Sequence, residues 1–272
     1  MELQFLGTAA AEGWPGLFCQ CDACQRARQA GGRNIRTRSS CLVDKELLVD
    51  FPPDTYMHVL HNRLDLGSIR HLIVTHSHQD HFYPEDLYMR KPPFAHLQEK
   101  ELLHVYGNDK VGEKLRQRVD METMSGYIEF HEISPFQSFR AGKAVVTPMT
   151  ARHDPNEKCL IYLIEMGGKH VLYGHDTGYF PEETWEFLKG KYLDGVILDC
   201  TSGLMKEGNY HMGFPDNRRV KERLLEEGTA GEDTLFIITH FSHNGGLLYD
   251  ELVAMAAPYG FEVTYDGAVF EL

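Results

Sequence analysis

Short apolar runs alternate with longer amphipathic segments along most of the chain. The runs are rich in Val, Ile and Leu, and many end at Gly, Asp or His, which is typical of buried strands. The predicted strands are Leu3–Leu6, Cys41–Val43, Leu47–Val49, His71–Val74, Ala144–Pro148, Leu160–Glu165, His170–Tyr173, Gly195–Leu198, Leu235–Thr239 and Glu262–Tyr265. The predicted helices are Asp54–Arg63, Lys110–Val119, Pro181–Lys189, Pro215–Glu227 and Leu247–Ala257. This order predicts an α/β domain in which packed sheets are covered by helices.

Length and composition narrow the class of protein. A chain of 272 residues is near the upper limit for one hydrophobic core, and its apolar and charged fractions are ordinary for a globular protein. The sequence has no internal repeat and no linker, so we expect one domain over residues 1–272. It also has no apolar run long enough to span a bilayer and no recognisable signal peptide, which favours a cytoplasmic protein without a membrane partner.

The charge balance limits the class of substrate. The formal net charge is −13, and a strongly acidic surface repels polyphosphate. We therefore expect no nucleic acid partner. A local pocket that carries metal ions can still bind a small anion, so a small-molecule substrate fits this balance.

The strongest chemical signal is the segment Thr75–His81, which reads His-x-His-x-Asp-His directly after an apolar run. Residues two apart in an extended chain point the same way, so His76 and His78 can bind one ion. If the chain then turns, Asp80 and His81 can reach a second ion nearby. Three further candidate ligands each stand at or just after a predicted strand end: His153, Asp176 and His240. One sheet edge can therefore gather all of these side chains.

Three of the six cysteines lie within six positions: Cys19, Cys21 and Cys24. In a chain without an export signal this bunching favours metal binding over disulfides. Three thiolates this close can bind one zinc ion, which needs a fourth ligand from elsewhere. We therefore predict a zinc-binding loop at about residues 17–33. The other cysteines lie in apolar runs and are interpreted as small core residues: Cys41, Cys159 and Cys200.

These ordered motifs resemble those of the metallo-β-lactamase superfamily, from the start around Phe5 to His240. The resemblance implies an αββα four-layer sandwich with the active site at one edge. It implies one ion bound by His76, His78 and His153, a second bound by Asp80, His81 and His240, and Asp176 bridging both. Imidazole and carboxylate ligands suit zinc or manganese, with iron and nickel as alternatives.

A narrower resemblance is to the PhnP-type phosphodiesterases, which carry a similar cysteine trio and a second histidine just after the last active-site ligand. It implies that His243 completes a structural zinc site with the three clustered cysteines. It also implies hydrolysis of a small cyclic phosphodiester, such as phosphoribosyl 1,2-cyclic phosphate, by a hydroxide held between two metal ions. PqqB proteins are similar in the cysteine trio, but the full ligand set here favours an active hydrolase.

The candidate proton donor is His211. In the PhnP and ribonuclease Z branches a histidine that is not a ligand occupies a corresponding place, and Asp199 can orient the ring so that the other nitrogen keeps its proton. Asp80 is counted among the catalytic residues as well as the ligands. His175 is interpreted as a residue behind the ligands or in the pocket. Phe82 and Tyr83 are expected to border the pocket and to reshape it.

Several alternatives stay open from the sequence. Arg36, Arg38 and Arg152 are either phosphate donors or, as the safer interpretation, solvated surface residues. The same metal site suits a thioester or lactone hydrolase. A nuclease like ribonuclease Z would need a basic arm that grips tRNA, and no such insertion is present. A metal-sensing module is disfavoured because structural metal sites are closed. A homodimer is the default expectation for the assembly.

Overall fold

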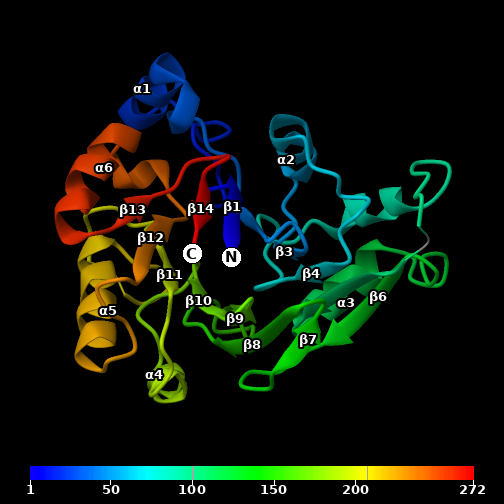
Figure 1. The fold of residues 1–272 in the computed structure, drawn as a ribbon. Helices are drawn as coiled ribbons and strands as arrows, with labels where there is room; N and C mark the ends of the chain where they lie inside the picture. The colour runs from blue at the N-terminus through cyan, green and yellow to red at the C-terminus, as the bar shows by residue number, and fades with distance from the viewer. Residues whose placement is uncertain (100, 207) are drawn as a thin grey trace.

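Two large sheets form the centre of the molecule. The computed structural model describes residues 1–99, 101–206 and 208–272, and within them each sheet has seven strands (Figure 1). The first sheet has the order β14 (Val269–Glu271), β1 (Glu2–Gly7), β2 (Ser40–Val43), β3 (Leu47–Val49), β4 (His71–Ile73), β5 (Leu103–Gly107) and β6 (Ile128–Glu132). The second has the order β13 (Glu262–Val263), β12 (Leu235–Thr239), β11 (Gly195–Asp199), β10 (Lys169–Gly174), β9 (Leu160–Met166), β8 (Ala144–Thr150) and β7 (Phe139–Ala141).

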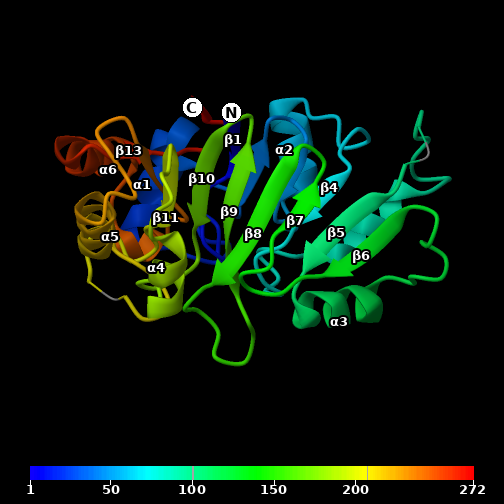
Figure 2. The ribbon, with the colours of Figure 1, turned by 60° about the horizontal axis from the view of Figure 1, so that its bottom comes forward.

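Helices cover the outer sides of the two sheets (Figure 2). The second sheet packs against α1 (Asp22–Ala30), α4 (Glu182–Leu188), α5 (Phe214–Glu226) and α6 (Tyr249–Ala256). The first packs against α3 (Asp109–Arg118) and the 3-10 turn Pro84–Arg90, while α2 (Thr55–Asn62) contacts β1. The predicted α/β class and the αββα sandwich are therefore confirmed.

Burial on both faces explains why the central strands are apolar throughout. Successive side chains of a strand point to opposite faces. In β11, Ile197 packs in the core between the two sheets, whereas Val196 and Leu198 pack against the helices. In β4, Ile73 lies between the sheets and Leu72 on the outer side. A strand covered on both faces has no alternation of apolar and polar residues, which explains the continuous apolar runs of these strands in the sequence.

The predicted elements are present, with ends shifted by a few residues, but five further strands and α-helices among the described residues were not predicted. Four are strands, namely β5, β6, β7 and β14, which carry His, Glu or Arg among their apolar residues. The fifth is α1, so the prediction of a loop over residues 17–33 is wrong for Asp22–Ala30. Ala23, Cys24 and Ala27 recur at helical spacing and are buried against the second sheet's outer side. Burial of this short apolar stripe explains why the segment folds as a helix.

The direction of the strands brings many strand ends to one edge. Strands β10, β11 and β12 are parallel, and β8 runs the same way because it pairs antiparallel with β9, which pairs antiparallel with β10. In the first sheet β3 and β4 are parallel. The predicted active-site residues lie at the ends of β4, β8, β10, β11 and β12 or in the loops that follow them.

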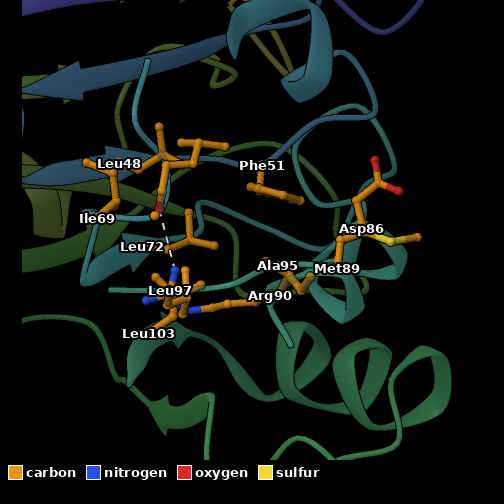
Figure 3. Close-up of a pocket in the computed structure, with 13 residues that line it drawn as sticks. Leu48, Phe51, Ile69, Leu72, Asp86, Met89, Arg90, Ala95, Leu97 and Leu103 are labelled. Carbon is orange, nitrogen blue, oxygen red and sulfur yellow. Dashed lines mark hydrogen bonds between the residues drawn. The ribbon is translucent and has the colours of Figure 1, made fainter. Parts of the chain in front are cut away.

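An apolar cavity lies on the outer side of the first sheet (Figure 3). Its walls include Leu48, Ile69, Leu72 and Leu103, and Arg90 at its side donates a hydrogen bond to the carbonyl oxygen of Leu66 at 3.4 Å. No predicted metal ligand is among its lining residues in the described part of the chain. The chemistry predicted from the sequence therefore belongs to a different cavity. Among the described residues, no helix combines the length and the apolar character needed to cross a bilayer.

Candidate active site

The seven predicted ligands come together at the edge where the strand ends meet. Their ligand atoms form two groups, and within each group all atoms lie within 4.8 Å of one another. One group is His76, His78, His153 and Asp176, and the other is Asp80, His81, Asp176 and His240. Asp176 belongs to both, as expected for a carboxylate that bridges two ions.

The facing atoms of these side chains fit bound cations. His81 Nε2 lies 3.3 Å from His240 Nε2, and His78 Nδ1 lies 3.2 Å from His153 Nε2. His76 Nε2 is buried and has no hydrogen-bond partner among the described residues, although Asp176 Oδ2 lies 3.2 Å away. Burying nitrogen lone pairs against one another is unfavourable unless a shared positive charge lies between them. The donor set therefore fits two divalent metal ions.

The opposite ring nitrogen of each of the five histidines contacts an oxygen atom. Such contacts fix the ring and its tautomer, and they are the usual support of metal-binding histidines. The contacts are His76 Nδ1 to Thr75 Oγ1 at 3.0 Å, His78 Nε2 to Asp154 Oδ2 at 3.2 Å, His81 Nδ1 to Asp50 Oδ2 at 2.7 Å, His153 Nδ1 to the Tyr210 carbonyl at 3.1 Å and His240 Nδ1 to Thr201 Oγ1 at 2.7 Å. All five rings are thus held with one nitrogen facing the ion site.

Asp50 is the most important supporting residue that the sequence analysis missed. It is fully buried after β3 and accepts hydrogen bonds from the Thr75 backbone N–H at 2.8 Å and from His81. His175 Nε2 lies 3.2 Å from the same carboxylate, so His175 supports the ligands from behind. Burial alone would raise the pKa of Asp50, but its contacts with His81 and His175 outweigh burial and hold that pKa below its ordinary value. The sequence signal that could have identified Asp50 is an acidic residue directly after a predicted strand.

The backbone at the site adopts conformations that non-glycine residues rarely take. Asp50, Asp176 and His240 have φ angles of 62°, 50° and 59°. A left-handed backbone costs free energy for residues with a Cβ atom, and such strain clusters at functional sites. Asp50 and His240 directly follow β3 and β12, and Asp176 lies two residues after the end of β10. The sharp turns at these strand ends direct Asp176 and His240 into the ligand groups and Asp50 toward His81 and His175 behind them.

His211 stands beside the ligand groups with two carboxylates at the same ring nitrogen. Its Nδ1 lies 3.0 Å from Asp176 Oδ1 and 3.3 Å from Asp199 Oδ2. Burial disfavours the charged ring, but the hydrogen bonds with Asp176 and Asp199 outweigh burial and raise the pKa of His211 to about 11. Asp199 is itself fixed, since it accepts from the backbone N–H groups of Thr201 and Met212. Nε2 is then the ring nitrogen that can face a substrate.

The ligand groups open into a cavity of about 470 Å³. His211 lines it together with small or polar residues such as Glu12, Thr201, Ser202 and Asn244. No lysine or arginine lines it in the described part of the chain. An anion in this cavity would therefore be neutralised by the bound cations and by His211.

The predictions for three other segments need correction. Arg36 is not a solvated residue, because it is buried, bonded to Thr8 Oγ1 at 2.7 Å and stacked on Phe241. Arg38 forms an ion pair with Asp54 at 3.0 Å. Phe82 packs in the outer core of the first sheet rather than against the cavity. Tyr83 is likewise absent from the described lining of the cavity. Arg152 is also absent from it and is exposed, which agrees with the safer interpretation as a solvated residue.

The cysteine cluster lies at the start of α1 and meets His243. His243 Nδ1 is 3.7 Å from Cys19 Sγ and 3.5 Å from Cys21 Sγ, and Cys24 completes a group within 4.8 Å. Burial raises the pKa of Cys24 to about 11. A bound zinc ion would reverse this shift, because thiols that coordinate a metal are deprotonated. The four side chains thus fit a closed tetrahedral site. As predicted, Cys41, Cys159 and Cys200 are buried.

We expect Cys21→Ser to remove one zinc ion per chain. Loss of a direct ligand should weaken zinc binding by more than the roughly 10–100-fold that loss of a supporting residue costs. Zinc content after dialysis, measured by elemental analysis, checks this, with the exposed neighbour Gln20→Ser as control. A chelator should also lower the thermal midpoint of the wild type more than that of Cys21→Ser. Full zinc retention by Cys21→Ser would show that this cysteine is no ligand.

Known proteins resemble the chain both in sequence and in structure. Residues 46–241 match the model of the beta-lactamase superfamily domain. No curated protein matches the chain. Among solved structures, the chain is similar to a diphosphatase from the PhnP family, with 21% identity, a TM-score of 0.77 and coverage of 100% of this chain and 97% of that one.

Two further structures are similar over the whole chain. Zn²⁺-bound PqqB from Methylobacterium extorquens has 19% identity and a TM-score of 0.74, with 100% of both chains covered. The short form of human tRNase Z has 18% identity and a TM-score of 0.66, with 100% of this chain and 99% of that one covered. At these identities the similarity shows a shared fold.

Proposed function

This chain belongs to the metallo-β-lactamase superfamily, and its own fold and candidate metal site make it a metal-dependent hydrolase. We propose that its substrate is a small phosphodiester. A cyclic diester such as phosphoribosyl 1,2-cyclic phosphate is the proposed class. The observation that carries the proposal is the place of His211, which lines the cavity beside both ligand groups while Asp176 and Asp199 hold its Nδ1.

The residues of the cavity suit each need of phosphodiester hydrolysis. When bound, two divalent ions lower the pKa of a water molecule and withdraw charge from the phosphoryl oxygens. Asp80, Asp176 and the five histidines would hold those ions. His211, protonated through its contact with Asp199, can deliver a proton from Nε2 to the leaving oxygen. Thr201 and Asn244 add polar contacts along the wall.

The charge of the cavity favours a small substrate with one phosphodiester. Glu12 lines the wall, and no lysine or arginine does so among the described residues. A long polyanion gains affinity from many basic contacts, and these are missing here. The PhnP-family diphosphatase and the tRNase Z share the fold, but the cavity and the net charge of −13 support the small-molecule substrate.

A panel of substrates tests the proposal. Metal-loaded protein should hydrolyse bis(p-nitrophenyl) phosphate and a ribose cyclic phosphate faster than a thioester or a lactone. Two bound divalent ions would withdraw charge from the phosphoryl oxygens of both phosphodiesters, and His211 can also protonate the alkoxide that leaves from the cyclic phosphate. Robust thioester or lactone cleavage without phosphodiester turnover would reject the phosphodiesterase and support the alternative hydrolase.

We expect Asp199→Asn to shift the alkaline limb of the pH–rate profile to lower pH. Asp199 raises the pKa of His211, and the acid works only while protonated, so the rate falls once the pH exceeds that pKa. Removing one nearby negative charge should move the limb by about 1–3 pH units. The profile of kcat/KM for a cyclic phosphodiester measures this shift. Asp194→Asn, before the opposite end of β11, is the control. An unmoved limb would contradict the role of Asp199.

A further inference from the structure

A second histidine cluster lies on the first sheet, outside the active site. Strand pairing places His71 opposite His104, His104 opposite Glu129 and Tyr106 opposite His131. Paired residues of neighbouring strands share one face, and residues two apart in one strand do so as well. All five side chains therefore project from the same face of β4, β5 and β6.

Three ligand atoms of this cluster meet at the spacing of a metal site. His104 Nδ1 lies 2.9 Å from His131 Nε2 and 3.3 Å from Glu129 Oε2, and His131 Nε2 lies 3.6 Å from that oxygen. Ligands at roughly 2.0–2.1 Å from a tetrahedral zinc ion lie about 3.3 Å from one another. We propose that His104, Glu129 and His131 form a further site for a divalent transition metal such as zinc.

The neighbouring aromatic rings hold the two histidines in this geometry. His71 stacks on His104 at a centroid distance of 5.4 Å, and Tyr106 stacks on His131 at 4.8 Å. Stacking on both rings reduces the rotamer freedom that the ligands would lose when they bind an ion. The side chains of His104, Glu129 and His131 are 30%, 50% and 34% exposed, so an ion can enter and water can fill the remaining position.

This site is separate from the proposed active site. The strand β4 begins at His71, which neighbours the cluster, and the loop with His76 follows its other end. Five extended residues span about 16 Å. None of the three proposed ligands belongs to the groups that surround Asp176. The site therefore does not depend on the proposed hydrolysis.

The test is a calorimetric titration of Zn²⁺ into protein whose active site and cysteine site already hold zinc. The wild type should bind one further equivalent. His104→Ala combined with His131→Ala should weaken that step at least 100-fold, since each lost ligand should cost more than about tenfold. His61→Ala, on the exposed side of α2, is the control and should bind like the wild type.

A milder variant guards against misfolding of the sheet. Glu129→Gln keeps the size of the side chain and removes the charge, so it should weaken the added step at least tenfold while phosphodiester turnover stays unchanged. The proposal would be overturned if the wild type bound no further equivalent of Zn²⁺, or if the double variant still bound that further equivalent as the wild type does. Both results are independent of which substrate the enzyme cleaves.

Discussion

Replacing Asp176 with asparagine should remove metal from the histidine site and lower kcat/KM by at least about 10³-fold. Asp176 Oδ2 lies 3.2 Å from His76 Nε2, 3.1 Å from His81 Nε2 and 3.5 Å from His153 Nε2. The neutral amide cannot neutralise two cations as the carboxylate does. Metal catalysis contributes several kcal/mol, and each 1.36 kcal/mol is tenfold in rate, which gives roughly this loss.

The choice of asparagine at position 176 separates the effect of losing a metal ligand from the effect of backbone strain. Asp176 has a left-handed φ of 50°, and asparagine tolerates that conformation well. Asp44→Asn is a matched control, because Asp44 also has a positive φ, at 46°, but is not one of the ligands. Elemental analysis and turnover are measured on the same preparations. Two retained ions with full turnover in Asp176→Asn would contradict the bridging role of Asp176.

Replacing His211 with glutamine should reduce turnover of an alkyl phosphodiester by about 10²–10⁴-fold while metal content stays the same. His211 is not among the seven predicted ligands, and its Nδ1 contacts carboxylates that stay in place when the ring is replaced. The loss should be much smaller for bis(p-nitrophenyl) phosphate, because p-nitrophenolate leaves without a proton. This difference between substrates is the signature of a general acid.

The control for this prediction is Tyr210→Phe, which changes the neighbouring exposed side chain and keeps the carbonyl that contacts His153. Rates with both substrates are compared for the two variants and the wild type. Equal losses on both substrates would show that His211 organises the site rather than donating a proton. Loss of metal in the His211 variant would instead identify this histidine as a ligand.

The sequence predicted the ligand groups because their spacing is local and their positions follow strand ends. His76 and His78 lie in one extended segment, so residue spacing alone pairs them. Asp176 and His240 each follow an apolar run, and the strand direction brings those ends together. The resemblance to a known superfamily supplied which ligand serves which ion, and the structure groups them in the same way.

The supporting contacts could not be predicted, because they depend on distant parts of the chain. Asp50 contacts His81 and His175, which are 31 and 125 residues away in the sequence. Arg36 is buried because Thr8 and the carbonyl of Thr264 accept its hydrogen bonds, and no local pattern indicates that. The cluster around His104 was missed since β5 and β6 mix polar and apolar residues and were not predicted as strands.

The central claim is that seven side chains bind two neighbouring metal ions at one sheet edge. Crystals of the protein grown with Mn²⁺, measured at the manganese absorption edge, test it most directly. The account predicts two anomalous peaks, one beside His76, His78 and His153 and one beside Asp80, His81 and His240, with Asp176 between them. The absence of an anomalous peak at this edge of the sheet, in active and metal-loaded protein, would contradict the account.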